Sequence, residues 1–255
     1  MSWATKRKLI YFLIVAGVLL AAVSVPLWRF FNKPPTCSDG KQNQSERGID
    51  CGGTCSLACK EDVSPLVIEW SRAFKVEDGT YDVVAFVENQ NGTYGVEKAI
   101  YHFKIYDKDN ILIAEKFGKT YVKEREKFAV FETGIKTGKR IPQRVFFEFA
   151  PDMSWEKVSA KSLNISTKDK VIIDIDSRPR LNVTIVNESF SPVKNLDIVA
   201  ILYDINDNAL SVSSTNISSM EKNSSKEISF TWKEPFLVNP NRIEIIPRTN
   251  PFSSE

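Results

Sequence analysis

Hydrophobic and polar positions follow two different patterns along the chain. Residues 9–28, LIYFLIVAGVLLAAVSVPLW, form an uncharged apolar run. A helix rises about 1.5 Å per residue, so a run of this length can cross the hydrocarbon core of a bilayer, which is roughly 30 Å thick. From about residue 64 onward, apolar and polar residues alternate, as expected for β-strands with one buried face. The sequence therefore predicts one apolar helix followed by an all-β region.

The apolar run has two interpretations, a membrane anchor and a cleaved signal peptide. Basic residues at 6–8 precede it, and the cytoplasmic flanks of membrane helices carry an excess of such residues. Ala22 and Ser24 could instead occupy the small-residue positions before a cleavage site, although the run is longer than a typical signal-peptide core. We therefore expect residues 1–8 in the cytoplasm, a single-pass transmembrane helix at residues 9–28 in contact with membrane lipid, and the remainder of the chain outside the cell membrane.

The alternating region predicts short antiparallel strands. Two segments show the pattern most plainly, with Val83, Ala85 and Val87 on one face of the first and Tyr101, Phe103 and Ile105 on one face of the second. Turn-forming sequences lie at residues 89–92, 107–110 and 137–140. Strands separated by regular turn signals, with no soluble helix between them, are typical of a β-sandwich.

Four sequence blocks in this region recur in the same order at an offset of 97 to 99 positions. The first set lies at residues 87–89, 103–107, 127–131 and 144–147, and its counterparts lie at 185–187, 200–204, 226–230 and 242–245. Chance similarity between strands is the alternative explanation. The near-constant offset favours two tandem β-sandwiches, which we place at residues 63–162 and 163–255.

Each sandwich resembles the FxLYD-type β-sandwich, an immunoglobulin-like extracytoplasmic domain named for a motif at the end of a central strand. The matching residues are Phe103, Ile105, Tyr106 and Asp107 in the first copy and Leu202, Tyr203 and Asp204 in the second. Ile105 replaces the Leu of the motif, and Ala200 replaces its Phe. The resemblance implies a fold and an envelope location but no general activity. We expect the apolar residues in the core, the Tyr along the rim, and the Asp at the start of a turn.

All four cysteines, Cys37, Cys51, Cys55 and Cys59, lie within residues 29–62, which we interpret as a linker and a Cys-rich module. An even number of cysteines in a small extracytoplasmic segment predicts two disulfides, because so short a piece cannot bury enough apolar surface to fold alone. Three pairings are possible, and the sequence does not select among them. A zinc site with four thiolate ligands is the alternative, but the spacing and an oxidising compartment favour disulfides.

The string from Cys37 to Cys55 resembles a short Cys-rich module with the pattern C-DG-N-E-G-DCGG-C, found in surface and secreted proteins and often beside immunoglobulin-like sandwiches. Within it, side-chain oxygens at short spacing come from Asp39, Asn43, Glu46 and Asp50. Such oxygens are the ligands that Ca²⁺ prefers, so calcium is the candidate cofactor. The alternative is that these side chains cap turns while neighbouring glycines provide positive φ angles.

Charge and composition narrow the function further. The 34 basic and 32 acidic residues are spread along the chain and give a net charge of +2, so no basic stripe for nucleic acid is present. His102, the single histidine, alternates onto the polar face of a strand, where we expect an exposed ring without a catalytic role. We therefore predict no enzyme and no catalytic residue. The favoured function is a structural or interaction module of the envelope or surface, with other envelope or surface proteins as partners. The alternatives are calcium-dependent adhesion, ligand binding, and an enzyme whose site lies between the sandwiches.

Overall fold

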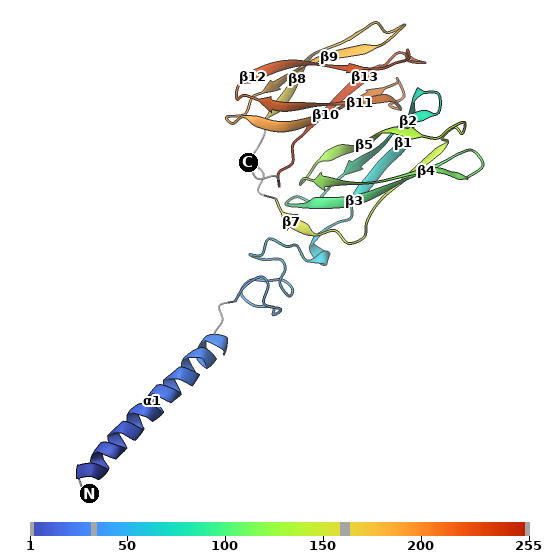
Figure 1. Cartoon of the computed structure of the whole chain (residues 1–255). Coiled ribbons are helices and arrows are strands. Elements are labelled where there is room, and N and C mark those ends of the chain that lie inside the picture. The colour runs from blue at the N-terminus through green and yellow to red at the C-terminus, as the bar shows by residue number, and fades with distance from the viewer. Residues whose placement is uncertain (1–2, 32–34, 159–163, 253–255) are drawn as a thin grey trace. The chain divides into compact units, whose positions relative to one another are not determined.

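The computed structural model describes residues 3–31, 35–158 and 164–252, and it forms two compact units, residues 1–55 and 56–255. Its described part contains an N-terminal α-helix, a short 3₁₀ helix and antiparallel β-strands, as Figure 1 shows. The prediction of an all-β fold after one N-terminal helix is confirmed. The predicted boundary between the sandwiches, at residues 162 and 163, lies outside the described residues.

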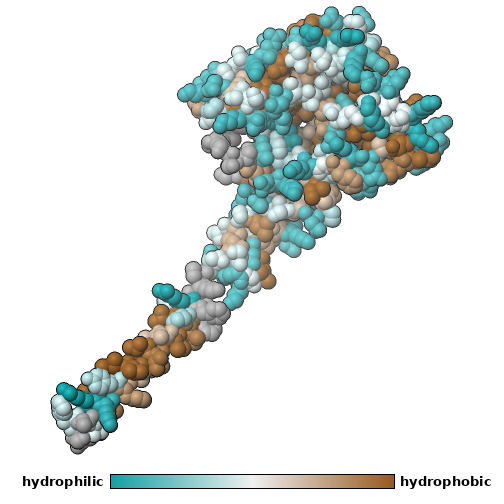
Figure 2. All heavy atoms as spheres, in the orientation of Figure 1, coloured by the Kyte–Doolittle hydropathy of each residue, from teal (hydrophilic) through white to brown (hydrophobic). Residues whose placement is uncertain are grey.

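The N-terminal helix α1 (Trp3–Phe31) is apolar over most of its length. Within Thr5–Arg29, an 18-residue window has a mean hydropathy of 2.5, and none of this window is buried within the protein. Figure 2 shows the hydrophobic side chains along it. The helix is long and apolar enough to cross a membrane, and an uncleaved signal sequence would have the same properties.

The first sandwich consists of two antiparallel sheets. One has the strand order β1-β2-β5, and the other has the order β4-β3-β6, with β7 paired to β3. The strands are β1 (Val67–Glu77), β2 (Thr80–Glu88), β3 (Tyr94–Tyr106), β4 (Leu112–Val122), β5 (Lys127–Lys136), β6 (Arg144–Phe149) and β7 (Trp155–Lys157), and the 3₁₀ helix η1 (Lys60–Asp62) precedes them. Fully buried side chains from both sheets, including Val83, Phe103 and Phe128, form its core.

Residues 56–58 extend the first sandwich at one end. The N–H of Ala58 donates to the carbonyl of Trp155 at 2.9 Å, and the N–H of Lys157 donates to the carbonyl of Ser56 at 2.8 Å. Residues 56–58 therefore run as an added strand beside β7, at the end of the sandwich where β3 begins.

The second sandwich also has two antiparallel three-stranded sheets, with the orders β12-β9-β8 and β11-β10-β13. The strands are β8 (Ile165–Ile173), β9 (Arg180–Asn187), β10 (Val193–Tyr203), β11 (Ala209–Met220), β12 (Ser224–Thr231) and β13 (Arg242–Arg248). Leu181, Ile198 and Phe230 are among the side chains that fill its core.

The two sandwiches share one strand order. The sheet β1-β2-β5 corresponds to β8-β9-β12, and the sheet β4-β3-β6 corresponds to β11-β10-β13. Equivalent loops are also tied in the same way. The buried amide of Asn89 donates to the carbonyl of Lys123 at 2.6 Å, and the buried amide of Asn187 donates to the carbonyl of Glu221 at 2.9 Å. Burial of a side-chain amide requires such partners, which explains why Asn stands at both positions.

A third apolar cluster, which we call the inter-sandwich cluster, joins the two sandwiches. Its buried members from the outer face of β2 and β5 are Val84, Phe86 and Ala129, and those from the outer face of β10, β11 and β13 are Val199, Ile201, Tyr203, Ala209, Val212 and Ile246. Trp70, Phe74 and Phe131 pack against it. The strands β2 and β10 are therefore buried on both faces, and the sandwiches form one packed unit.

Candidate functional site

The Cys-rich module is closed by disulfides. Cys37 and Cys55 are bonded, with Cα atoms 5.6 Å apart, and Cys51 and Cys59 are also disulfide-bonded. The prediction of disulfides is confirmed, and all four thiols that a zinc site would need are consumed. The tight packing of the loop explains one glycine, because a Cβ on Gly53 would lie 1.7 Å from the carbonyl oxygen of Ser45.

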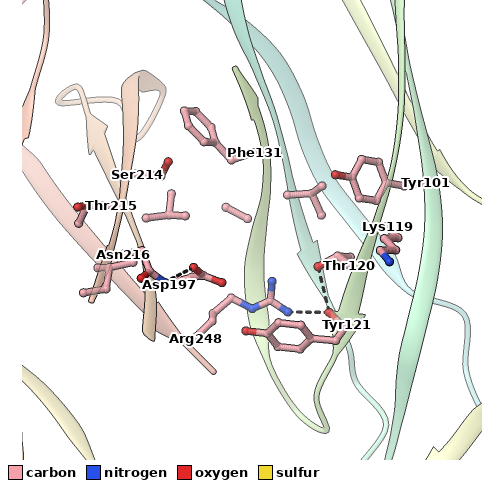
Figure 3. A pocket seen from close by; sticks show the side chains of 14 residues that line it. Tyr101, Lys119, Thr120, Tyr121, Phe131, Asp197, Ser214, Thr215, Asn216 and Arg248 are labelled. Atoms are coloured by element: carbon pink, nitrogen blue, oxygen red, sulfur yellow. Dashed lines mark hydrogen bonds between the residues drawn. The ribbon is translucent and has the colours of Figure 1, made fainter. Parts of the chain in front are cut away.

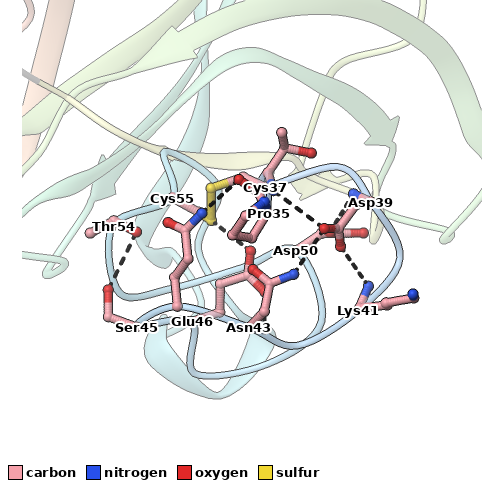
Figure 4. The surroundings of a disulfide bond; sticks show 12 residues. Pro35, Cys37, Asp39, Lys41, Asn43, Ser45, Glu46, Asp50, Thr54 and Cys55 are labelled. Atoms are coloured by element: carbon pink, nitrogen blue, oxygen red, sulfur yellow. Dashed lines mark hydrogen bonds between the residues drawn. A yellow bond between two sulfur atoms is a disulfide. The ribbon is translucent and has the colours of Figure 1, made fainter. Parts of the chain in front are cut away.

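The predicted calcium ligands lie together beside the Cys37–Cys55 disulfide (Figure 4). The carboxylate of Asp50 accepts the N–H groups of Asp39 at 3.0 Å and Gly40 at 2.9 Å. The carboxylate of Asp39 accepts the side-chain amide of Asn43 at 2.8 Å, and this bond lowers the pKa of Asp39. Glu46 accepts the N–H of Asn43 at 3.1 Å. These are turn-capping hydrogen bonds, and calcium binding by the same oxygens stays a prediction.

The apolar residues of the FxLYD-like motifs lie in the sandwich cores. Phe103 and Ile105 are fully buried in the first core, and Leu202 is fully buried in the second. Tyr203 differs from the expected rim position, because it is buried in the inter-sandwich cluster. The guanidinium of Arg242 lies 3.7 Å above the ring of Tyr203.

The aspartates of the two motifs open equivalent turns. Asp107 accepts the N–H of Ile111 at 2.9 Å, and Asp204 accepts the N–H of Asn208 at 2.8 Å. The backbone N–H of Ile111 is the main cause of the lowered pKa of Asp107, and the ion pair with Arg140 lowers it further. In the second turn, the backbone N–H of Asn208 lowers the pKa of Asp204. Both carboxylates thus serve the turns after β3 and β10.

His102 is less exposed than its strand alternation predicts. Its side chain is 16% exposed, because the ring of Phe117 stacks on it with centroids 3.8 Å apart. Nε2 lies 3.1 Å from a carboxylate oxygen of Glu115, and Nδ1 lies 3.7 Å from one of Glu148. The two carboxylates face opposite nitrogens, so the three groups do not converge on one point as the ligands of a metal ion would.

The ring belongs to a larger surface on the outside of the sheet β4-β3-β6, which we call the aromatic face. It consists of Ile100, His102, Lys104, Tyr106, Leu112, Glu115, Phe117, Lys119, Arg144, Phe146 and Glu148, which the strand register places on one side of the sheet. Tyr106 and Phe146 make a second ring pair, with centroids 5.5 Å apart. Phe117 is 64% exposed and Phe146 is 55% exposed, so large aromatic side chains remain in solvent on this face.

A cleft of about 440 Å³ lies between the sandwiches, lined by residues of β3, β4, β5, β10, β11 and β13 (Figure 3). Arg248 is its central charged group. Arg248 is 8% exposed, and its guanidinium donates to Glu126 at 2.7 Å and to the carbonyl of Tyr121 at 2.8 Å. The same guanidinium lies over the rings of Tyr121 and Phe128, at 4.3 and 4.2 Å from their centroids.

Among the described residues, some of the other polar groups of the cleft have hydrogen-bond partners and others do not. Asn216 donates to Asp197 at 2.7 Å across β11 and β10. The phenolic oxygen of Tyr121 is buried and has no hydrogen-bond partner among the described residues, and burial raises the pKa of this phenol. Sequence reasoning did not identify Arg248 as important, since its partner Glu126 lies 122 positions earlier in the chain.

Comparisons with known proteins do not assign the chain to a family. No family model and no curated protein matches it. Solved structures that resemble it include red sea bream transglutaminase, with 13% identity, a TM-score of 0.24, and coverage of 74% of this chain and 30% of that one. A β-glucuronidase from glycoside hydrolase family 2 has 11% identity and a TM-score of 0.23, with coverage of 80% of this chain and 25% of that one. The chain thus spans less than a third of either protein, and similarity at this level supports no functional assignment. An N-terminal apolar helix followed by disulfides is typical of a membrane-anchored or secreted protein.

Proposed function

We propose that the chain is a single-pass membrane protein whose two β-sandwiches form one interaction module outside the cytoplasm. Helix α1 is the membrane anchor, and its side chains contact membrane lipid. The disulfides support an oxidising compartment, since such bonds are rare in the cytosol. The sandwiches are duplicated immunoglobulin-like domains of the FxLYD type, supported by their shared strand order and by the matched Asp107 and Asp204 turns.

The observation that carries the proposal is the inter-sandwich cluster. Domains of one chain usually move relative to each other unless their interface is large and hydrophobic. Here buried aliphatic and aromatic side chains from both sandwiches pack together, and ion pairs such as Lys233–Glu77 and Arg248–Glu126 surround them. The module therefore presents its outer surfaces in a fixed arrangement, which suits a spacer or a docking platform. In the cleft, Arg248 is paired with Glu126 and Asp197 accepts the side-chain amide of Asn216, which favours a structural role for these two groups over catalysis.

Membrane anchoring and orientation can be tested together. Protease added to intact cells or spheroplasts should digest the sandwiches, and alkaline carbonate should leave the undigested protein in the membrane. Because Leu19 lies near the middle of the apolar run, Leu19→Arg places a charge there at a cost of about 2.5–3.5 kcal/mol and should release the protein from the membrane. Leu19→Phe is the matched control and should remain anchored.

Two results would refute this proposal. Complete protection of the sandwiches in sealed cells would place them in the cytoplasm. A mature N-terminus at or near Val25, with the protein free of the membrane, would identify the apolar run as a cleaved signal peptide.

A further inference from the structure

We propose that the aromatic face binds the outer sheet face of a β-sandwich in another protein. The two sheets would pack face to face, as the outer sheets of the two sandwiches of this chain do. This inference deepens the proposed function, on which it rests, by naming the docking surface and the class of partner.

The inter-sandwich cluster provides the template for this contact. It joins the outer face of β1-β2-β5 in the first sandwich to the outer face of β11-β10-β13 in the second. Since β11-β10-β13 corresponds to β4-β3-β6, the contact joins two unlike faces of one repeated fold. A contact between unlike faces is not self-complementary, so it leaves one face of each kind uncovered. These are the outer face of β4-β3-β6 in the first sandwich and the outer face of β12-β9-β8 in the second.

The uncovered face of the second sandwich has a polar centre, and its exposed apolar residues Val171 and Ile173 lie on the edge strand β8. On the outer side of β12-β9-β8, Glu227 pairs with Thr184 and Ser229 pairs with Asn182 across the strands. The hydroxyl of Ser229 donates to the amide oxygen of Asn182 at 2.7 Å. Polar outer faces of this kind terminate stacks of repeated domains, because they have little to gain from being covered.

The uncovered face of the first sandwich is the aromatic face, and its chemistry is different. Phe117, Phe146 and Ile100 are 64%, 55% and 47% exposed. Exposed aromatic side chains grouped on one surface are typical of protein interfaces. The stacking of Phe117 on His102 and the edge contact of Phe146 with Tyr106 hold the rings in place before binding, which lowers the entropy lost in the complex.

The equivalent face of the second sandwich shows what covers such a surface. Because Phe103–Asp107 corresponds to Ala200–Asp204, His102 corresponds to Val199 and Lys104 to Ile201, and both of these are buried against the first sandwich. The covering face has a centre of aliphatic and aromatic side chains, including Val84 and Phe86. We therefore infer a partner face with an apolar centre of this kind.

A second copy of the chain does not offer that face. Its own β1-β2-β5 face is already buried in the inter-sandwich cluster, and the centre of its remaining β12-β9-β8 face is polar, with Asn182 and Thr184 on the middle strand. Arg144, at the edge of the aromatic face, corresponds to Arg242, and Lys119 adds a further exposed cation. The partner therefore combines an apolar centre with an acidic rim.

Site-specific photocrosslinking in the protein's own membranes tests this inference. The photoreactive residue p-benzoylphenylalanine is placed at Phe117 on the aromatic face, and at Glu227 on the polar face as a matched control. We expect an adduct from position 117 with a different protein that contains a β-sandwich, and none from position 227. Adding Phe146→Glu to the position-117 variant should reduce the adduct roughly tenfold, because truncating a central aromatic contact typically costs at least that much affinity. Its urea midpoint should be unchanged, because Phe146 is exposed.

Three outcomes would overturn the inference. These are no adduct from position 117, an adduct only with a second copy or with lipid, and equal adducts from both positions. The same membranes treated with protease separate this inference from the proposed function. If the sandwiches are digested but position 117 gives no adduct, the docking surface is wrong and the anchored module stands. If they are protected, the proposed function itself fails.

Discussion

Replacing Arg248 with Met tests whether the two sandwiches are locked together by a buried ion pair. Met retains an unbranched apolar stem that can rest on Tyr121 and Phe128, so the substitution removes mainly the charge and its hydrogen bonds. The side chains of Arg248 and Glu126 are 8% and 12% exposed, so solvent screens their interaction little. Glu126 would keep one donor, the N–H of Lys123 at 2.7 Å, but would lose the guanidinium.

The expected cost follows from leaving one buried charge without its partner. Breaking a buried ion pair typically destabilises a protein by about 3–5 kcal/mol, and the remaining Lys123 donor places this case near about 3 kcal/mol. With an m-value of about 2–3 kcal/mol/M, the urea midpoint should fall by about 1–1.5 M. The measurement is equilibrium unfolding of the chain after the apolar helix, followed by tryptophan fluorescence.

A double-mutant cycle with Glu126→Gln isolates the pair. The double variant should lose less stability than the sum of the two single variants, with a coupling energy of about 0.5–3 kcal/mol for residues in contact. Lys119→Met, at an exposed lysine lining the same cleft, is the control and should shift the midpoint little. If Arg248→Met behaves like this control and the coupling is zero, the ion pair contributes nothing to holding the sandwiches together.

Four further predictions address the core, the turns, the disulfides and calcium. Ile201→Ala should cost about 2–5 kcal/mol in urea unfolding, because Ile201 is fully buried in the inter-sandwich cluster; a cost below about 1 kcal/mol would contradict the close packing. The folded-state pKa values of Asp107 and Asp204 are lowered, so their stabilisation is complete above the unfolded value of 3.8 and is lost as pH falls through the folded values. The Tm deficit of Asp107→Asn/Asp204→Asn should therefore be largest at pH 7 and shrink below pH 3.8, whereas a constant deficit would exclude the carboxylate charge as its cause. Thiol titration of the native protein should find no free cysteine, and reduction should leave the main thermal transition almost unchanged, because both sandwich cores form without cysteines. Calcium binding by Asp39 and its neighbours predicts a heat in calorimetric titration that disappears in Asp39→Asn, whereas no heat would leave the carboxylate of Asp39 with its turn-capping hydrogen bonds alone.

Local patterns were sufficient to predict the elements of the fold. The alternation of Phe103 and Ile105 with His102 and Lys104 correctly separates the core side of β3 from its outer side. The turn after β3 was also predictable, since Asp107 followed by polar residues is a short-range signal that depends only on neighbouring backbone groups. Features of this kind are encoded within a few residues, so they can be inferred before any tertiary contact is known.

The contacts between the sandwiches were not predictable in the same way. Residues 83–87 and 198–202 are continuous apolar runs, which indicates strands buried on both faces, but such runs do not say what covers the second face. The same applies to Arg248, whose partner Glu126 is 122 positions away and belongs to the other sandwich. Alternation also overstated the exposure of His102, because the covering ring of Phe117 comes from the neighbouring strand. Each of these features depends on which faces meet, and strand periodicity carries no information on that.

The differences between the two equivalent faces indicate how permanent each contact is. At corresponding positions, the covered face has Val199, Ile201 and Ile246, whereas the aromatic face has His102, Lys104 and Glu148. Permanent interfaces resemble a protein core, whereas interfaces that form and dissociate retain charged residues so that each partner is soluble alone. At the centre of the aromatic face, Lys104 lies 2.6 Å from Glu148, so these two charges neutralise each other.

A face that must be stable in water and still bind a partner needs both charged groups and exposed apolar area. The ion pairs on the aromatic face keep it hydrated while it is uncovered, and Phe117 and Phe146 supply apolar area when it is covered. The aliphatic counterpart on the second sandwich would aggregate if it were exposed, and the first sandwich covers it within the same chain. We therefore expect the contact on the aromatic face to be reversible, and the contact between the two sandwiches to persist for as long as the chain is folded.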